Sequence, residues 1–230
     1  MKERIEQIIQ LIRPDSSGII DVGTDHGYVP VQLARSGFTG AIFASDIREA
    51  PLRKAISYAS ECNVLDRITF SLADGLDGSN PDCFDTIIIA GMGGDTICRI
   101  LDRAEWLESP GYSLILQPMT HAEVVRYWLV HNGYRIDREL LSCEADHFFQ
   151  LMFCQFGQNN KMSDAEYLVG SSVNRNRDLL YQMLVNHQIQ ILEKKYRGLS
   201  DSFIEKKEEL VFWQKVIMEL KELQQNDNNK

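Results

Sequence analysis

The chain has 230 residues, of which 44% are hydrophobic, and it carries a net charge of −9. This size and composition suit one α/β domain with an appendage, or two small domains. The acidic balance argues against a general nucleic-acid binder, and the absence of a long apolar run excludes a membrane-spanning helix. The first residues lack the apolar core of a signal peptide, so we expect a cytoplasmic protein. Cysteines and histidines are scattered without the spacing of metal ligands, so no metal site is expected.

The first two thirds of the chain alternate between short apolar runs and helical patterns. An amphipathic helix is expected first, because Ile5, Ile8, Ile9 and Ile12 recur at helical spacing. The expected strands are 18–22, 41–46, 68–73, 86–90 and 114–117, and the expected helices are 29–36, 51–62, 95–106 and 121–132. This alternation predicts a parallel sheet covered by helices on both faces. Segments 134–141 and 148–156 have no helix between them, which predicts an antiparallel hairpin at the sheet edge.

The character of the sequence changes after residue 157. Residues 165–225 show no strand signal, and their apolar spacing predicts two long helices that form an antiparallel hairpin. The break is expected near Gly198-Leu199-Ser200, with Ser200 or Asp201 as the cap. We therefore expect an α/β domain at 1–157 and a helical hairpin at 158–230. The first part holds 13 basic against 22 acidic residues, and the second holds 11 of each. The basic groups of the second part either form solvated helix faces or contact a nucleic acid.

The segment 19–27, "IIDVGTDHG", predicts a strand that ends in a nucleotide-binding loop. Gly23 and Gly27 stand where the backbone must turn sharply and approach a ligand. A dinucleotide loop usually reads G-x-G-x-x-G, but here Asp25 replaces the middle glycine, and its charge would repel a pyrophosphate. The acid favours a cationic ligand, such as the sulfonium and amino group of S-adenosylmethionine.

Acidic residues also follow the next two expected strands. Asp46 lies 23 residues after Gly23, where an acid is placed to accept hydrogen bonds from both ribose hydroxyls. Asp74 follows the third strand and could bond the adenine amino group, with Ala73 and Gly75 offering backbone groups. Acids at successive strand ends predict a lined crevice outside the carboxyl edge of the sheet.

The fourth strand runs into "AGMGGDTI". Gly91, Gly93 and Gly94 leave almost no side-chain bulk, so a flat ligand can approach the backbone closely. Methyltransferases that act on exocyclic amines usually carry an N/D-P-P-Y/F segment at this place. The chain lacks that segment, which makes exocyclic-amine methylation less favoured.

Together, "DVGTDHGYVP", "DIREAPLRKA", "AGMGGDTI" and "LILQP" with a following "RYWL" resemble the bacterial tRNA (adenine-N1)-methyltransferases that act at tRNA position 22. The resemblance spans roughly residues 5–156, and the helical hairpin agrees with the appendage of that family. It implies a Rossmann-like class I methyltransferase fold, S-adenosylmethionine as cofactor and tRNA as partner. Two departures lie on the expected substrate side: Met119 stands where the family usually has Asn, and Asp146-His147-Phe148 stands where it usually has a Tyr-Glu pair.

The site residues expected from these motifs fall into three groups. The cofactor-binding group is Asp21, Gly23, Thr24, Gly27, Asp46, Ile47, Ala73, Asp74, Gly75, Ala90, Gly91, Met92, Gly93 and Gly94. The substrate-binding group is Gln117 with the basic residues Arg175, Arg177, Lys194, Lys195 and Arg197. The catalytic candidates are Asp25 and then His26, either of which could stabilise a cationic product base or accept an N6 proton.

Three alternatives stay open from the sequence. A methyltransferase for a small metabolite would use the helical hairpin for dimerisation. A nicotinamide-binding oxidoreductase would share the Rossmann pattern, although Asp25 argues against it. A non-catalytic scaffold would keep the fold without the activity.

Overall fold

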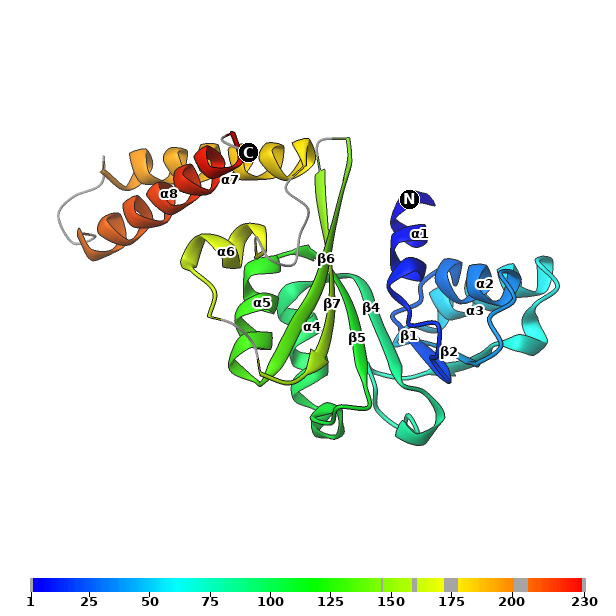
Figure 1. Cartoon of the computed structure of the whole chain (residues 1–230). Helices are drawn as coiled ribbons and strands as arrows, with labels where there is room; N and C mark the ends of the chain where they lie inside the picture. The colour runs from blue at the N-terminus through cyan, green and yellow to red at the C-terminus, as the bar shows by residue number, and fades with distance from the viewer. Residues whose placement is uncertain (1, 146, 159–160, 172–177, 201–206, 229–230) are drawn as a thin grey trace.

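The fold is built on one mixed sheet. The structure is a computed structural model that describes residues 2–145, 147–158, 161–171, 178–200 and 207–228. Its seven strands follow the order β3-β2-β1-β4-β5-β7-β6 (Figure 1). They are β1 Gly18–Val22, β2 Ala41–Asp46, β3 Thr69–Leu72, β4 Thr86–Gly93, β5 Ser113–Thr120, β6 Tyr134–Glu144 and β7 His147–Phe156. Strands β1 to β5 pair in parallel, whereas β7 pairs antiparallel with both β5 and β6, which confirms the predicted parallel sheet with an antiparallel edge hairpin.

Helices cover both faces of this sheet. They are α1 Lys2–Leu11, α2 Tyr28–Arg35, α3 Glu49–Glu61, α4 Gly94–Asp102, α5 Ala122–His131, α6 Asp164–Val169, α7 Leu179–Ser200 and α8 Lys207–Asn228. Helices α1, α2 and α3 pack on the face that carries Ile19 and Ile88, and α4 and α5 pack on the face that carries Ile20 and Ile87. Burial on both faces explains why the central strands read as continuous apolar runs. None of the described helices is long and apolar enough to cross a bilayer.

Strand β4 continues further than the glycines suggest. It was expected to end at Ala90, but its pairing with β5 resumes at Met92 and Gly93 after register shifts. Gly91 makes this possible, because it takes a left-handed backbone with φ of 81°. The irregular end of β4 therefore turns Gly91 and Met92 toward the carboxyl edge of the sheet.

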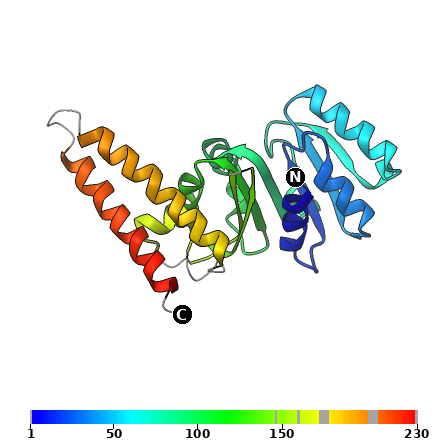
Figure 2. The same ribbon diagram turned by 90° about the horizontal axis from the view of Figure 1, so that it is seen from above.

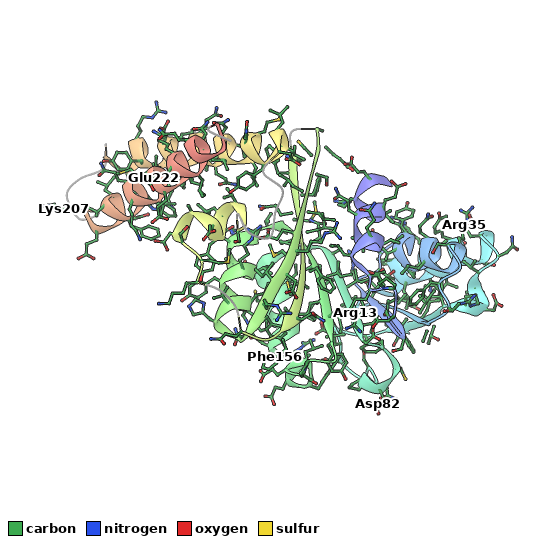
Figure 3. All side chains as sticks on the ribbon, in the orientation of Figure 1. Arg13, Arg35, Asp82, Phe156, Lys207 and Glu222 are labelled. Carbon is green, nitrogen blue, oxygen red and sulfur yellow. The ribbon has the colours of Figure 1, made fainter. Side chains whose placement is uncertain are left out.

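The C-terminal part contains one more helix than expected. The short helix α6 precedes the long pair and begins with a reciprocal cap between Ser163 and Glu166. Helix α7 ends at Ser200, which confirms the predicted break near Gly198-Leu199-Ser200, and the connection 201–206 lies outside the described residues. Side chains of α6, α7 and α8 meet in one apolar cluster between the three helices (Figure 3).

A buried polar cluster ties these helices to the sheet. The guanidinium of Arg126 on α5 donates to Glu139 Oε2 on β6 at 2.6 Å and to Gln150 Oε1 on β7 at 2.7 Å. It also donates to the carbonyl oxygen of Tyr167 on α6 at 2.8 Å, and Glu139 Oε1 accepts from the amide of Ser171 at 3.1 Å. The side chains of Arg126 and Glu139 are fully buried. The cluster thus joins the seven-stranded sheet to α6 and Ser171, while the boundary at residue 157 stays a prediction.

The helical pair lies beyond the β6 edge of the sheet, opposite the side of α2 and α3 (Figures 1 and 2). The end of α8 that carries Lys207 projects away from the sheet (Figure 3). With 22 residues, α7 is about 33 Å long. The last turns of α7, which hold Lys194, Lys195 and Arg197, therefore form part of a projecting arm, called here the distal arm.

Candidate functional site

A cavity of about 880 Å³ opens at the carboxyl ends of the parallel strands. It lies where the strand order reverses between β1 and β4, the place at which open α/β sheets bind their ligands. Most of the predicted site residues line it: Asp21, Gly23, Thr24, Asp25, His26, Asp46, Ile47, Ala73, Asp74, Gly75, Ala90, Gly91, Met92 and Gln117. The fold thus brings residues from five strand ends into one site.

Asp21 is a buried carboxyl group at the end of β1. It is 4% exposed, and its Oδ2 accepts a hydrogen bond from Thr24 Oγ1 at 2.7 Å. Burial raises the pKa of Asp21 from 3.8 to about 6, the bond from Thr24 opposes this rise, and the charge of Asp46 adds to it. A buried acid of this kind is stabilised in its ionised form by a cationic ligand, which fits the sulfonium and ammonium groups of S-adenosylmethionine.

The loop after β1 is shaped by left-handed residues. Gly23 and Gly27 have φ of 71° and 70°, and Asp25 has φ of 50°. The amides of Gly23 and Thr24 both donate to the carbonyl oxygen of Ser45 at 2.8 Å, which fixes the loop against the end of β2. A Cβ on Gly23 would collide with the methyl group of Met92. The left-handed turn therefore favours glycine at position 23, whereas the flexible end of Met92 can move aside.

Asp46 is held in place by backbone amides. Its Oδ1 accepts from the amide of Arg48 at 2.8 Å, and its Oδ2 accepts from the amide of Asp25 at 3.2 Å. The residue is 4% exposed and lines the cavity. A carboxylate has about four lone-pair sites, so two such bonds leave acceptor capacity for a ribose diol. The geometry fits the ribose contact predicted from the sequence.

Replacing Asp46 with alanine is expected to weaken S-adenosylmethionine binding by about 1–3 kcal/mol, because charge-assisted hydrogen bonds are lost. Isothermal titration calorimetry measures this change directly. Asp66→Ala is the matched control, since Asp66 is exposed and lies outside the cavity lining. Unchanged affinity in a folded Asp46→Ala protein would remove Asp46 from the site.

Asp74 is engaged by an arginine that the sequence analysis did not single out. Arg103 Nη1 donates to Asp74 Oδ2 at 2.9 Å, and Arg103 Nη2 donates to the carbonyl oxygen of Asp74 at 2.8 Å. The hydrogen bond from Arg103 lowers the pKa of Asp74, so the carboxylate stays ionised near neutral pH. Arg103 thereby fixes the loop after β3, and the adenine contact of Asp74 stays a prediction.

Three predicted glycines lie outside the cavity lining. A Cβ on Gly27 would meet Ala55 Cβ at 2.9 Å, and one on Gly94 would collide with the carbonyl oxygen of His121. A Cβ on Gly93 would point at Thr120 Oγ1 at 3.3 Å. These glycines therefore permit close packing of helices and strands around the site, while their contact with a ligand stays a prediction.

Of the basic residues predicted to bind the substrate, three can be placed relative to the cavity. Arg175 and Arg177 fall outside the described residues. Lys194, Lys195 and Arg197 lie on the distal arm and do not line the cavity. The Lys195 ammonium sits 3.9 Å from the centre of the Trp213 ring and 3.8 Å from Glu209.

Both catalytic candidates line the cavity. Asp25 Oδ2 and His26 Nε2 are 3.5 Å apart, and their side chains are 56% and 40% exposed. The pair is therefore reachable by a ligand at the mouth of the cavity. The assignment of Asp25 before His26 stays a prediction.

Sequence reasoning missed two walls of the cavity. Helix α1 contributes Arg4, Ile5 and Ile8, and nothing local in its sequence indicates where an amphipathic helix docks. Helix α4 and its C-cap residue contribute several polar residues, among them Thr96, Arg99, Asp102 and Arg103. The sequence did contain a signal for this wall, because the polar residues at positions 96, 99 and 103 have the spacing of one helical face.

The fold and the site together define a nucleotide-cofactor enzyme of the doubly wound α/β class, with acids rather than a pyrophosphate loop at the first strand end. A family model described as a methyltransferase domain matches residues 1–152, and the chain belongs to this family.

Relatives extend the match to the helical pair. The tRNA (adenine(22)-N(1))-methyltransferase of Bacillus subtilis (strain 168) is 24% identical over 207 residues, which cover 88% of this chain and 87% of that protein. The crystal structure of the B. subtilis m1A22 tRNA methyltransferase TrmK matches with a TM-score of 0.85, 24% identity, and coverage of 96% and 97% of the two chains. M. capricolum TrmK in complex with S-adenosyl-homocysteine matches with a TM-score of 0.80, 25% identity, and coverage of 96% of each chain.

Proposed function

We propose that the protein transfers a methyl group from S-adenosylmethionine to N1 of adenine 22 in tRNA. The observation that carries the proposal is the match over 88% of the chain to a relative named for this activity. The match over 96% of the chain to M. capricolum TrmK includes the helical pair. The buried acid Asp21 and the amide-held Asp46 support the choice of cofactor. When bound, S-adenosylmethionine supplies a methyl group carried on a positively charged sulfur.

The protein's contribution to this reaction is alignment in a shielded site. Adenine N1 keeps a free lone pair at neutral pH, so no base is needed to create the nucleophile. Asp21 and Asp46 hold the cofactor, and the bulk-free backbone at Gly91 leaves open space, since no atom lies within 4 Å of a Cβ built there. Asp25 and His26 line the same cavity, where a carboxylate or imidazole stabilises the cationic product base.

The distal arm suits a large substrate. The helical pair lies beyond the β6 edge of the sheet (Figure 2), and the basic residues of the arm do not line the cavity. A small metabolite bound in the cavity would not reach this arm, whereas a folded RNA spans such distances. We therefore assign the tRNA backbone contact to the arm, and the target adenine to the cavity.

Nucleoside mass spectrometry tests the proposal most directly. tRNA from cells that lack the gene should lose 1-methyladenosine, and the purified protein should restore it to unmodified tRNA when S-adenosylmethionine is added. Primer-extension arrest at position 22 locates the modified base. Absence of methyl incorporation into any tRNA would overturn the proposal.

Removing two charges from the distal arm is expected to weaken tRNA binding and flatten its salt dependence. Lys194→Gln with Arg197→Gln should reduce the slope of log Kd against log salt by about one per lost phosphate contact. These positions avoid Lys195, whose ring contact would confound the result.

Lys215→Gln with Lys221→Gln is the matched control. It removes the same charge from the same helical pair, but these lysines are paired with Asp164 and Glu193 at 2.8 and 2.7 Å. Such exposed pairs contribute little to stability, so the control should fold. Equal salt slopes for the wild type and the Lys194/Arg197 variant would mean that tRNA docks elsewhere.

A further inference from the structure

Gln117 has a buried, unpaired carbonyl oxygen and belongs to the wall of the cavity. The residue lies near the end of β5, is 1% exposed and lines the cavity. Its Nε2 donates to the carbonyl oxygen of Pro118 at 2.8 Å. This bond requires a donor at that position, so it also determines which way the amide points. Among the described residues, no donor reaches Gln117 Oε1.

An unpaired buried acceptor destabilises the folded protein, and this acceptor belongs to a residue that lines the cavity. A buried polar atom without a partner typically destabilises a protein unless a ligand or water satisfies it. Gln7 Oε1 and Ser142 Oγ are also buried and unsatisfied within the described part of the chain, but neither residue lines the cavity. Gln117 is therefore distinguished by its position at the site.

The strand order places Gln117 on the acceptor side of the cavity. From Asp46 at the end of β2, the sheet runs through β1 and β4 to β5, which is three strand spacings or about 14 Å. Gln117 pairs in register with Ala90, which precedes the open Gly91 backbone. A cofactor that spans the β2 and β1 ends thus leaves the β5 end to the molecule that is methylated.

We infer that Gln117 Oε1 accepts a hydrogen bond from the exocyclic amino group of the target adenine and thereby selects this base; the inference rests on the proposed function. The Watson–Crick edge of adenine carries an N6 amino donor beside the N1 acceptor. Guanine carries an O6 acceptor and an N1–H instead, so its oxygen would face the oxygen of Gln117. A polar site rejects such an analogue because its own buried group stays unpaired.

The same bond favours the transition state over the ground state. As the N1–methyl bond forms, the sulfur–methyl bond breaks and neutral S-adenosyl-homocysteine is left. The positive charge passes to the base and spreads from N1 to the amino group, so N6–H becomes a stronger donor. Hydrogen bonds to charged groups are stronger than hydrogen bonds to neutral groups. Loss of the Gln117 carbonyl is therefore expected to lower kcat more than it raises KM.

A double-mutant cycle between enzyme and substrate tests the inference. Wild type and Gln117→Met are assayed on tRNA that carries adenine or unsubstituted purine at the target position, since purine lacks only the amino group. Purine N1 is intrinsically less nucleophilic, but this difference is common to both enzymes and cancels in the cycle. We expect Gln117→Met to lose about tenfold in kcat/KM on adenine tRNA and little on purine tRNA.

Gln7→Met is the matched control, because it removes a similarly unpaired carbonyl away from the cavity. It should leave the adenine-to-purine ratio at the wild-type value. If a variant is too slow to assay, the same cycle is measured as tRNA affinity with S-adenosyl-homocysteine bound. Equal losses on both tRNAs would overturn the inference while leaving the methyltransferase assignment intact. A wild type that methylates no tRNA would overturn the proposed function itself.

Discussion

Replacing Arg126 with methionine is expected to destabilise the protein by about 3–5 kcal/mol, because it leaves Glu139 buried without its cationic partner. The two side chains are fully buried, and their closest atoms are 2.6 Å apart. The same substitution removes donors from Gln150 and from the carbonyl oxygen of Tyr167. Urea unfolding followed by circular dichroism measures the change in the free energy of unfolding.

Two variants frame this result. Arg138→Met lies on β6 beside Glu139, but Arg138 is exposed, so the effect should stay within about 0.5 kcal/mol. Adding Glu139→Gln to Arg126→Met should recover part of the loss, since the uncompensated charge is gone. A loss below about 1 kcal/mol for Arg126→Met would contradict the ionised pair. Arg126 also donates a hydrogen bond to a carbonyl oxygen of α6. A protease should therefore cleave the Arg126→Met protein sooner than the wild type in the segment that leads to α7.

Replacing Asp21 with asparagine is expected to stabilise the ligand-free protein at pH 7.5 and to weaken its affinity for S-adenosylmethionine. Burial raises the pKa of Asp21 from 3.8 to about 6. The folded state therefore binds the proton more tightly than the unfolded chain does. The contribution of Asp21 to stability is fully present below pH 3.8 and is lost as the pH rises through about 6. This difference corresponds to about 3 kcal/mol.

Asparagine removes this dependence while keeping an oxygen that accepts from Thr24. Thermal unfolding between pH 4 and pH 8 should show a shallower decline for Asp21→Asn than for the wild type.

Asp85→Asn is a control of opposite sign. Burial raises the pKa of Asp85, but hydrogen bonds from Ser16, Ser17 and Thr86 outweigh this and lower it. That variant should lose stability at neutral pH. Identical pH profiles for wild type and Asp21→Asn would contradict the buried-acid assignment.

At Asp21 the same buried charge lowers the stability of the ligand-free protein and raises its affinity for the cofactor. An ionised acid held in a buried site destabilises the ligand-free fold, and a cationic cofactor relieves this cost on binding. Affinity for S-adenosylmethionine should therefore rise as the pH increases through about 6. Gln117 resembles Asp21 in this respect, because its buried carbonyl oxygen is also unpaired in the ligand-free protein and would gain a partner when a ligand binds.

The sequence by itself determined the strands of the sheet and most of the residues that line the cavity at the strand ends. Strand and helix positions follow from local periodicity, and the chain segments β1, β2 and β4 carry their turn residues directly after their apolar runs. Parallel strands bring their carboxyl ends to one edge, so Asp21, Asp46 and Asp74 could be assigned to one crevice before any coordinates. These are features in which neighbours along the chain decide the outcome.

Only the tertiary structure decided what distant segments do to one another. The docking of α1 placed Arg4 in the cavity wall, and the hydrophobic pattern of that helix says only that one face is buried. Likewise, Arg126 meets Glu139 and Gln150 because α5, β6 and β7 pack together, and their spacing in the sequence carries no such signal. The unpaired oxygen of Gln117 is visible only once every neighbouring donor has been placed. Pairing, burial and orphaned groups depend on the whole packed core, which local propensity does not specify.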